Sequence, residues 1–438
     1  MEYVIQGLGL ILSLSILVVL HEMGHFVFAR IFKTRVEKFY LFFNPWFSLF
    51  KKKIGDTEYG VGWLPLGGYV KISGMIDESM DKEQLKQEPQ PWEFRSKPAW
   101  QRLFIMIGGV LVNFILALII YSMILFTWGS DYLPVKNATW GYHFNDVAKG
   151  FGFQNGDKII LADGKEIEEI SDLSRNILLG NVKSVEIERN GQRSIVNIPH
   201  DGTKKILASG EKFYLEPRFP FVVEKVIDGN PAAKAGMQAG DSIVSINGIP
   251  FGMYTDFADK LKPYAGKKTR LGFYRNGQYL EKELIPTEDA KVGIQPKSPV
   301  HFFDVKHIEY GFFESIPAGI SQGFETLGGY VKSLKLVFSK EGAKQVGGFG
   351  TIGGLFPKVW DWQIFWNMTA LLSVILAFMN ILPIPALDGG HVLFLLFEMI
   401  TGRKPSDKFL EYAQVIGMVI LFSLLIFANG NDFLKLFK

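Results

Sequence analysis

Val18-Val19-Leu20-His21-Glu22-Met23-Gly24-His25-Phe26 places three ionisable side chains inside an apolar stretch that extends from residue 3 to Ala29. Residues 3–20 carry no charge at all. About 20 helical residues cross a hydrocarbon core of about 30 Å, so the stretch predicts a transmembrane helix. A signal peptide is a poorer interpretation, because the apolar run is too long, its start lacks basic residues and it carries the ionisable cluster.

Three further uncharged stretches are long enough to cross a membrane. The sequence therefore predicts a polytopic α-helical membrane protein with four transmembrane helices, over about residues 3–29, 103–128, 362–387 and 412–431. The chain of 438 residues is 48% hydrophobic, which suits a protein that is part membrane and part aqueous. A net charge of +3 with mixed signs gives no argument for a nucleic-acid partner. Without cysteine, any metal must be held by His, Asp or Glu.

The distribution of basic residues predicts the orientation of these helices. The loop from Arg30 to Arg102 contains thirteen Lys and Arg residues, and the connector after the third span contains Arg403, Lys404 and Lys408. The positive-inside rule places both segments on the cytoplasmic side. Both chain termini and the large insert between the second and third spans are then expected outside.

The insert, about residues 131–361, contains an internal repeat. Gly156-Asp157 recurs as Gly240-Asp241, and Arg189-Asn190-Gly191-Gln192 recurs as Arg275-Asn276-Gly277-Gln278. Short β-branched runs between turn dipeptides indicate β-hairpins. The repeat therefore predicts two small domains that are mainly β.

These two domains are expected over residues 131–218 and 219–300. The second contains Asn230–Asp241, which resembles the turn and hairpin signature of PDZ domains, whereas the first lacks the Pro-Ala-Ala turn. PDZ domains bind extended peptides, often free C-termini, by adding a strand to a sheet edge. The alternative is a pair of other small β domains that act as spacers.

An amphipathic helical connector is expected over residues 301–361, because Phe312, Ile316, Ile320 and Phe324 recur every four residues. The membrane core then consists of two parts, residues 1–130 and 362–438, that flank the insert and its connector.

The cluster on the first span has the spacing of a zinc site. His21 and His25 are four residues apart and lie one turn apart on one helix face, where two imidazoles can share one Zn²⁺. Glu22 lies about 100° around the helix and is placed to take a proton from an attacking water, as in the HExxH arrangement. Ionisable groups inside a span are costly and usually functional. The alternatives are a satisfied polar cluster between helices and a proton pathway.

A catalytic zinc needs a third protein ligand and an open position. The candidate is Asp388, which follows 26 uncharged residues. Pro383 and Pro385 interrupt the helix before it, and irregular backbone at membrane depth is tolerated only where it is buried or lines a wet cavity. The first and third spans run in the same direction, so both bring their polar groups to the cytoplasmic half. His391 is expected to be a neighbour of the site rather than a ligand.

His21–His25 on the first span, together with Leu387-Asp388-Gly389 on the third, resembles the site-2 protease family of intramembrane zinc metalloproteases. With its paired β domains between spans two and three, the chain resembles the bacterial RseP-type branch of that family. The resemblance implies that zinc is bound by His21, His25 and Asp388, and that Glu22 is the catalytic residue. It also implies a multi-pass protein of the bacterial inner membrane, with PDZ domains on the periplasmic side and the active site toward the cytoplasm.

The resemblance implies two further elements of the site. Asn380, upstream of Asp388, would hold substrate or stabilise the oxyanion; the alternative is a hydrogen bond that closes the helix break. A cytoplasmic, membrane-dipping β loop is expected over about residues 55–75, with Gly67, Gly68 and Tyr69 beside an extended substrate. The family's Gly-rich stretch before the third span is matched only loosely, by Gly350-Thr351-Ile352-Gly353.

The implied activity is hydrolysis of peptide bonds within transmembrane segments, after a first cleavage by another protease. Implied substrates are single-span membrane proteins, such as anti-sigma factors or signal-peptide remnants. Other expected partners are peptides or C-termini at the PDZ domains and membrane lipid. Two rival functions are a metal or proton transporter and a PDZ-bearing scaffold with an inactive site.

Overall fold

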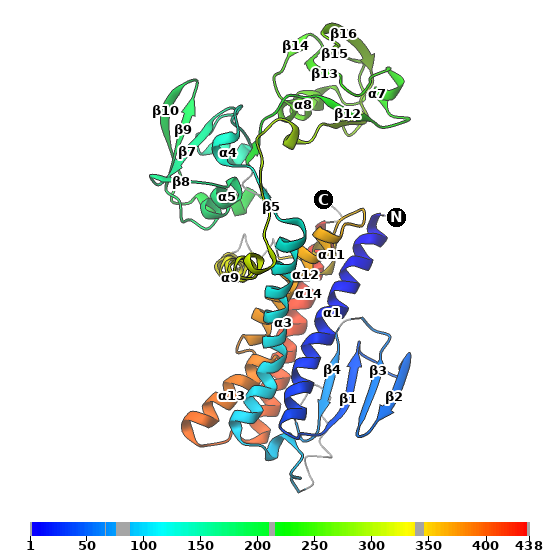
Figure 1. Ribbon diagram of the computed structural model, residues 1–438, viewed down its shortest axis with the longest axis vertical. Helices are drawn as coiled ribbons and strands as arrows, with labels where there is room; N and C mark the ends of the chain where they lie inside the picture. The colour runs from blue at the N-terminus through cyan, green and yellow to red at the C-terminus, as the bar shows by residue number, and fades with distance from the viewer. Residues whose placement is uncertain (1, 66, 76–87, 210–214, 338–345, 436–438) are drawn as a thin grey trace. The chain divides into compact units, whose positions relative to one another are not determined.

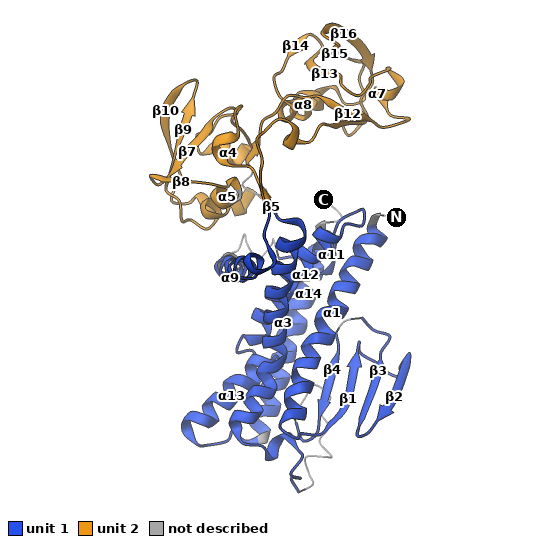
Figure 2. Cartoon of the chain, in the orientation of Figure 1, with its two compact units in different colours: residues 1–129, 309–438 blue, residues 130–308 orange. Residues whose placement is uncertain are grey.

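The computed structural model describes all residues except 1, 66, 76–87, 210–214, 338–345 and 436–438 (Figure 1). The chain forms two compact units (Figure 2). The first, here the helical unit, comprises Met1–Gly129 and Glu309–Lys438. The second, here the insert unit, comprises Ser130–Ile308.

Four helices of the helical unit are long and apolar enough to cross a membrane, the same number of candidate spans that the sequence predicts. They are α1 (Glu2–Ile31), α3 (Ala99–Trp128), α12 (Trp362–Ile381) and α14 (Asp407–Lys435). α3 is the centre of the unit and packs against α1, α9, α12 and α13. Its buried side chains include Ile105, Ala117 and Ile120.

The third span ends earlier than residue 387. α12 stops at Ile381, and the chain continues without helix to Asp388, where α13 (Asp388–Thr401) begins. Pro383 and Pro385 have no N–H to donate to a continuing helix, which explains the early end. α13 ends at Gly402, which adopts the left-handed conformation (φ 69°) that favours glycine at a helix C-terminus.

A four-stranded sheet follows α1 in the chain and lies beside it (Figure 1). Its strands, in the order β2-β3-β1-β4, are β1 (Val36–Leu41), β2 (Phe50–Ile54), β3 (Thr57–Val61) and β4 (Tyr69–Ile72). β1 pairs in parallel with β3 and antiparallel with β4, so β4 is an edge strand. The sheet starts well before the β loop expected at about residue 55, and Leu66 in that loop lies outside the described residues.

Two helices of the helical unit, α9 and α11, precede α12 in the chain. α9 (Phe312–Val337) packs on α3 through ring contacts of Phe324 with Phe114 and of Phe312 with Phe126. α11 (Phe349–Gly353) follows. Of the expected connector, residues 338–345 lie outside the described part of the chain.

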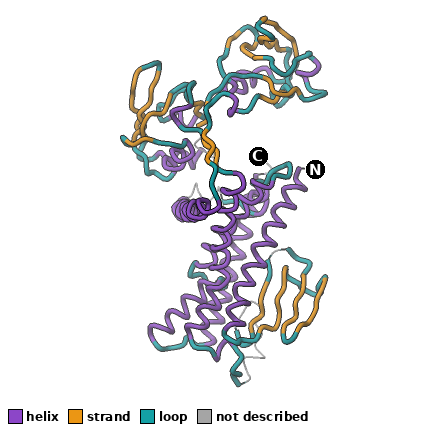
Figure 3. The backbone as a smooth tube through the Cα atoms, viewed as in Figure 1, coloured by secondary structure: helices purple, strands orange, loops and turns teal. Residues whose placement is uncertain are grey.

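The insert unit contains two modules with the same strand order, mainly β as expected (Figure 3). In the first, β10-β9-β7-β8, the strands are β7 (Lys158–Ala162), β8 (Lys165–Glu166), β9 (Ser184–Arg189) and β10 (Gln192–Asn197). In the second, β16-β15-β13-β14, they are β13 (Ser242–Ile246), β14 (Ile249–Pro250), β15 (Thr269–Arg275) and β16 (Gln278–Leu284).

Each module adds helices and a two-stranded ribbon to its sheet. The first has α4 (Asp146–Gly150), α5 (Ile170–Leu178), α6 (Gly202–Ser209) and the pair β6 (Tyr142–Phe144) and β11 (Leu215–Pro217). The second has α7 (Pro231–Lys234), α8 (Tyr254–Leu261) and the pair β12 (Val223–Val226) and β17 (Ile294–Pro296). β5 (Ser130–Tyr132) pairs with β18 (Lys306–Ile308) and joins the two ends of the unit.

The sequence repeat reappears as a repeated ion pair. Arg189 donates two hydrogen bonds of 2.7 Å to the carboxylate of Asp157, and Arg275 donates two of 2.7 Å to that of Asp241. Both carboxylates are almost fully buried. The two modules are therefore duplicates down to an individual side-chain contact.

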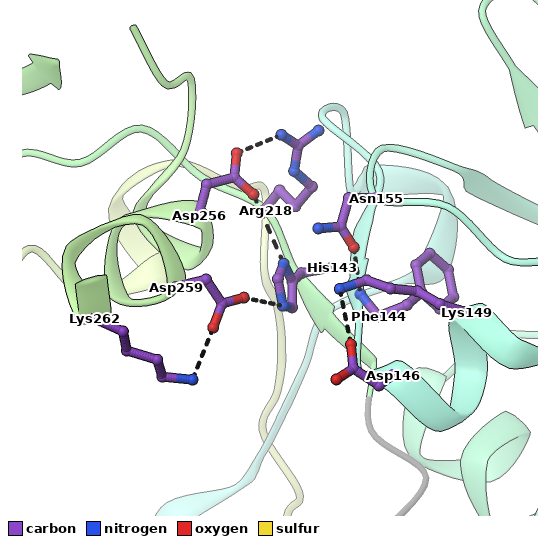
Figure 4. A network of polar contacts seen from close by, with 9 residues as sticks. All are labelled: His143, Phe144, Asp146, Lys149, Asn155, Arg218, Asp256, Asp259 and Lys262. Carbon is purple, nitrogen blue, oxygen red and sulfur yellow. Dashed lines mark hydrogen bonds and ion pairs between the residues drawn. The ribbon is translucent and has the colours of Figure 1, made fainter. Parts of the chain in front are cut away.

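A polar network lies where the two modules meet (Figure 4). The ring nitrogens of His143 lie 3.7 Å from Asp256 and 3.9 Å from Asp259, on α8. Arg218 donates a hydrogen bond of 2.8 Å to Asp256. The next residue, Phe219, is buried and stacks on Tyr254. The segment between the modules is thus held by both charge and aromatic packing.

Candidate metal centre

Three side chains of the helical unit converge on one point. The Nε2 atoms of His21 and His25 lie 3.2 Å apart, and they lie 3.2 and 3.3 Å from Oδ2 of Asp388. Among the described residues this is the one group of three or more His, Asp or Glu side chains whose potential ligand atoms gather closely enough to hold a metal ion. The tertiary structure thus brings together the three residues expected to bind zinc.

The spacing of these atoms suits zinc. Zn–N and Zn–O bonds of about 2.0–2.1 Å in a tetrahedral site separate neighbouring ligand atoms by about 3.3 Å. The three separations observed, 3.2, 3.2 and 3.3 Å, agree with that value. Two imidazoles and one carboxylate are also the donor set of catalytic zinc sites that keep one position open.

The hydrogen bonding of His25 determines which of its ring nitrogens faces Asp388. Its Nδ1 lies 2.8 Å from the backbone carbonyl of Ile105, which only accepts hydrogen bonds, so Nδ1 carries a hydrogen. In the neutral ring, Nε2 then presents a lone pair to the carboxylate of Asp388. Two acceptors that face each other at 3.3 Å repel unless a positive charge lies between them.

Helix packing leaves room for the two rings. A Cβ atom on Gly109 of α3 would lie 2.5 Å from Nε2 of His25 and 2.6 Å from Cε1 of His21. Cβ atoms on Gly24 or Gly108 would clash with the backbone of the opposite helix. α1 and α3 therefore cross closely enough for α3 to form the wall of the site.

The break after α12 delivers Asp388. A Cβ atom on Gly389 or Gly417 would clash with the carbonyl of Leu382 or Pro385, so the turn, α13 and α14 are packed tightly around it. Asp388 is the first residue of α13. The prolines and glycines around Asp388 predict a helix break at this point, and the break carries the Asp388 carboxylate.

The side chains of His21, His25 and Asp388 line a cavity of about 520 Å³. The functional residues expected from the sequence all line it: His21, Glu22, His25, Gly67, Gly68, Tyr69, Asn380 and Asp388. The backbone of Val70 on β4 lies close to the carboxylate of Glu22. The edge strand and the candidate base therefore share one cavity. The side chain of Asn380 lines the same cavity and makes no hydrogen bond with another described residue.

The β4 edge approaches α1 because Gly68 has no side chain. A Cβ atom there would lie 2.6 Å from the carbonyl of Tyr40 and 2.7 Å from Cγ1 of Val18. The phenol of Tyr69 points elsewhere: it donates to Asn44 at 2.9 Å, and its ring stacks on Tyr40. Burial raises the pKa of Tyr69 to about 12. Its side chain stays protonated and supports the sheet.

Sequence reasoning missed three residues of the site. Gly109 forms the wall described above. Asn113 on α3 is fully buried beside His21, and Gln414 on α14 is 5% exposed and lines the cavity. A polar amide inside an uncharged apolar run was the available signal for both Asn113 and Gln414. His391 also lines the cavity, outside the group of potential ligands.

A membrane-helix core with an HExxH helix and a distant aspartate defines the class of membrane-bound metallopeptidases. The sequence pattern of peptidase family M50 matches residues 9–424, and the chain belongs to this family. The predicted membership of the site-2 protease family is thereby confirmed.

Relatives of nearly equal length support the same conclusion. The chain is 30% identical to the regulator of sigma E protease of Haemophilus influenzae, over 97% of this chain and 98% of the relative. It is 29% identical to the regulator of sigma-E protease RseP of Escherichia coli, with the same coverage. It is 28% identical to a protein of Neisseria meningitidis named as a zinc metalloprotease, over 98% and 99% of the two chains. The protein is a zinc metalloprotease with several apolar helices that are long enough to cross a membrane.

Proposed function

We propose that this protein hydrolyses peptide bonds within the transmembrane segments of single-span membrane proteins, after another protease has made a first cut. The observation that carries the proposal is the position of His21, His25 and Asp388. They meet inside a bundle of apolar helices, and the two histidines lie on a helix that is itself long enough to span the membrane. A substrate bond must enter that bundle to reach them. Anti-sigma factors and signal-peptide remnants are substrates of the required single-span kind.

In this proposal zinc is held by His21, His25 and Asp388. When bound, zinc polarises a carbonyl group and acidifies water. Glu22 takes the proton of the attacking water and returns it to the leaving amine. The free amide of Asn380, in the same cavity, donates a hydrogen bond to the carbonyl oxygen as negative charge develops there.

Substrate is proposed to bind as an added strand on β4. A helical segment uses its own carbonyls in hydrogen bonds and must unwind before one of them can be attacked. Among the described residues β4 pairs with β1 alone, and the segment Gly67–Val70, which leads into β4, lines the cavity beside Glu22. A free strand edge supplies main-chain hydrogen bonds to an extended peptide irrespective of its sequence.

The two modules of the insert unit are proposed to be PDZ domains that bind peptides or free C-termini. Supporting this, the second carries the Asn230–Asp241 turn and hairpin, and the first repeats its strand order. The distribution of Lys and Arg supports a periplasmic position for them and a cytoplasmic-side active site in a bacterial inner membrane. On that side they would select substrates that had already been shortened.

The test is cleavage of a purified single-span substrate by the full-length protein in detergent micelles. The wild type should cleave within the transmembrane segment, and a chelator or Glu22→Gln should abolish cleavage. The neighbouring Met23→Leu, at a half-exposed position, is the control and should cleave normally. Cleavage that persists in Glu22→Gln, or only outside the apolar segment, would refute the proposal.

A further inference from the structure

Asn113 is a buried amide in an apolar helix. It lies on α3 between Val112 and Phe114, with no exposed surface. A buried polar group is costly unless it is hydrogen-bonded. Nδ2 of Asn113 lies 3.4 Å from Nδ1 of His21, whereas Oδ1 is buried and has no hydrogen-bond partner among the described residues. The amide therefore lies beside the metal centre with its acceptor unused.

If His21 binds a metal, its second ring nitrogen determines whether Asn113 must donate or accept a hydrogen bond. Its Nε2 faces Asp388 and His25, so Nε2 is the atom that can bind a metal. A neutral imidazole with a free lone pair on Nε2 carries its hydrogen on Nδ1. The atom of His21 that faces Asn113 is thus a donor, and it requires an acceptor.

Rotating the amide by half a turn meets both requirements. The oxygen and nitrogen of an Asn amide have nearly the same shape and are assigned from their hydrogen bonds. After the rotation, Oδ1 of Asn113 accepts from Nδ1–H of His21. Oδ1 of Asn113 and the Nδ1 hydrogen of His21 then each gain a hydrogen-bond partner.

The surrounding helices hold Asn113 in place for this contact. Its backbone carbonyl accepts a hydrogen bond of 2.6 Å from Ser373 of α12, which is also fully buried. The other histidine has a matching arrangement, because Nδ1 of His25 contacts the carbonyl of Ile105, also on α3. α3 thus presents one acceptor to each imidazole of α1.

We propose that the amide oxygen of Asn113 accepts the Nδ1 hydrogen of His21, and so fixes the ring orientation and the tautomer that present Nε2 to zinc. Asn113 is a positioning residue, and its role rests on the proposed assignment of His21 as a ligand. Loss of such an outer partner of a metal-binding histidine typically lowers metal affinity about 10–100-fold.

The test compares two variants of similar shape in the detergent-solubilised full-length protein. Asn113→Asp keeps the acceptor, and Asn113→Leu removes it. Zn²⁺ affinity is measured by competition with a chelating dye, and the visible spectrum of the Co²⁺-substituted protein reports ligand geometry. Asn113→Leu should bind Zn²⁺ about 10–100-fold more weakly with an altered Co²⁺ spectrum. Asn113→Asp should bind at least as tightly as the wild type.

The control is Ser122→Ala on the same helix, whose hydroxyl donates mainly within the helix, to Leu118. It should change neither affinity nor spectrum. Equal Zn²⁺ affinity in folded Asn113→Leu and wild type would overturn the inference. If Asn113→Leu does not fold, nitrogen-15 histidine spectra of the zinc-loaded wild type and Asn113→Asp decide. The Nδ1 proton of His21 must be present and must shift in Asn113→Asp; no shift overturns the inference.

His21→Ala separates this inference from the proposed function. If His21→Ala loses Zn²⁺ and Asn113→Leu does not, only the role of Asn113 is wrong. If His21→Ala retains full Zn²⁺ affinity, the ligand assignment itself is wrong. If the variants change affinity as expected but the wild type cleaves no transmembrane substrate, the proposed substrate class is wrong and the role of Asn113 stands.

Discussion

The imidazole of His25 on α1 is hydrogen-bonded through Nδ1, at 2.8 Å, to the backbone carbonyl of Ile105 on α3. Because a carbonyl cannot donate, this contact determines which ring nitrogen faces Asp388. It also requires α1 and α3 to lie close together, which Gly24, Gly108 and Gly109 permit. The geometry of the metal centre therefore depends on how two membrane helices pack.

Gly109→Ala should damage the metal centre directly. The added methyl group would lie 2.5 Å from Nε2 of His25, so the rings must move out of position. Overpacking of this kind costs about 1–3 kcal/mol, and we expect bound zinc and the cleavage rate to fall at least about tenfold. Metal analysis of the purified protein measures the first effect. Gly328→Ala on α9, where a Cβ atom meets nothing within 4 Å, should retain its zinc.

Asp388→Asn and Glu22→Gln should separate metal binding from proton transfer. Asn is a poor substitute for a carboxylate ligand, so Asp388→Asn should lose both zinc and activity. Glu22→Gln should keep its zinc but lose cleavage by a factor of about 10²–10⁴, the usual contribution of a general base. Zinc content and single-turnover cleavage are measured on the same preparations. A zinc-free Glu22→Gln protein would mean that Glu22 is itself needed to hold the metal.

Gly68→Ala should weaken substrate cleavage while sparing the metal. Its methyl group would meet the Tyr40 carbonyl at 2.6 Å and Val18 at 2.7 Å, so β4 must move away from α1. We expect kcat/KM for a single-span substrate to fall about tenfold with zinc content unchanged. Lys52→Ala, on the exposed opposite edge strand β2, is the control. Equal effects of the two changes would argue against binding at the β4 edge.

Arg189→Leu should destabilise the first module of the insert unit. It leaves the carboxylate of Asp157, 1% exposed, without its cation, which costs about 3–5 kcal/mol in buried pairs. Hydrogen exchange in β7 and β9 of the full chain reports the loss. Arg193→Leu removes a partner of Glu186 from an exposed pair and should cost less than about 1 kcal/mol. Arg275→Leu should have the same effect on the second module, because its contact with Asp241 is a copy.

The junction of the two modules should weaken only in acid. Burial raises the pKa of Asp256, but the hydrogen bond and positive charge of Arg218, together with the neighbouring His143 ring, outweigh it, so the pKa lies below its ordinary value of 3.8. A lowered folded-state pKa contributes stability that is fully present above the ordinary value and is lost as pH falls through the folded-state value. Urea unfolding of the insert unit, followed at pH 6 and at about pH 3, should show this loss. Asp256→Asn should remove it, whereas Asp259→Asn, at an exposed position, should not.

Local patterns in the sequence were sufficient for much of the protein. Uncharged runs of about 20 residues predicted the four apolar helices, because a helix that faces lipid must be apolar along its whole length. The spacing of His21 and His25 follows from one helical turn. The repeat around Asp157 and Asp241 predicted the duplicated modules, since each copy folds through contacts within itself.

Other features depend on contacts between segments far apart in the chain. The pairing of β1 with β4, the α1–α3 crossing at Gly109 and the network around His143 leave no periodic signal, because each depends on which surfaces meet. The contact of the Tyr69 phenol with Asn44 also depends on which surfaces meet. By itself, the sequence determined the spans, the motif and the repeat. Only the tertiary structure decided that α3 forms the wall beside His21 and His25 and brings the Ile105 carbonyl to the His25 ring, because side-chain partners are set by packing rather than by spacing.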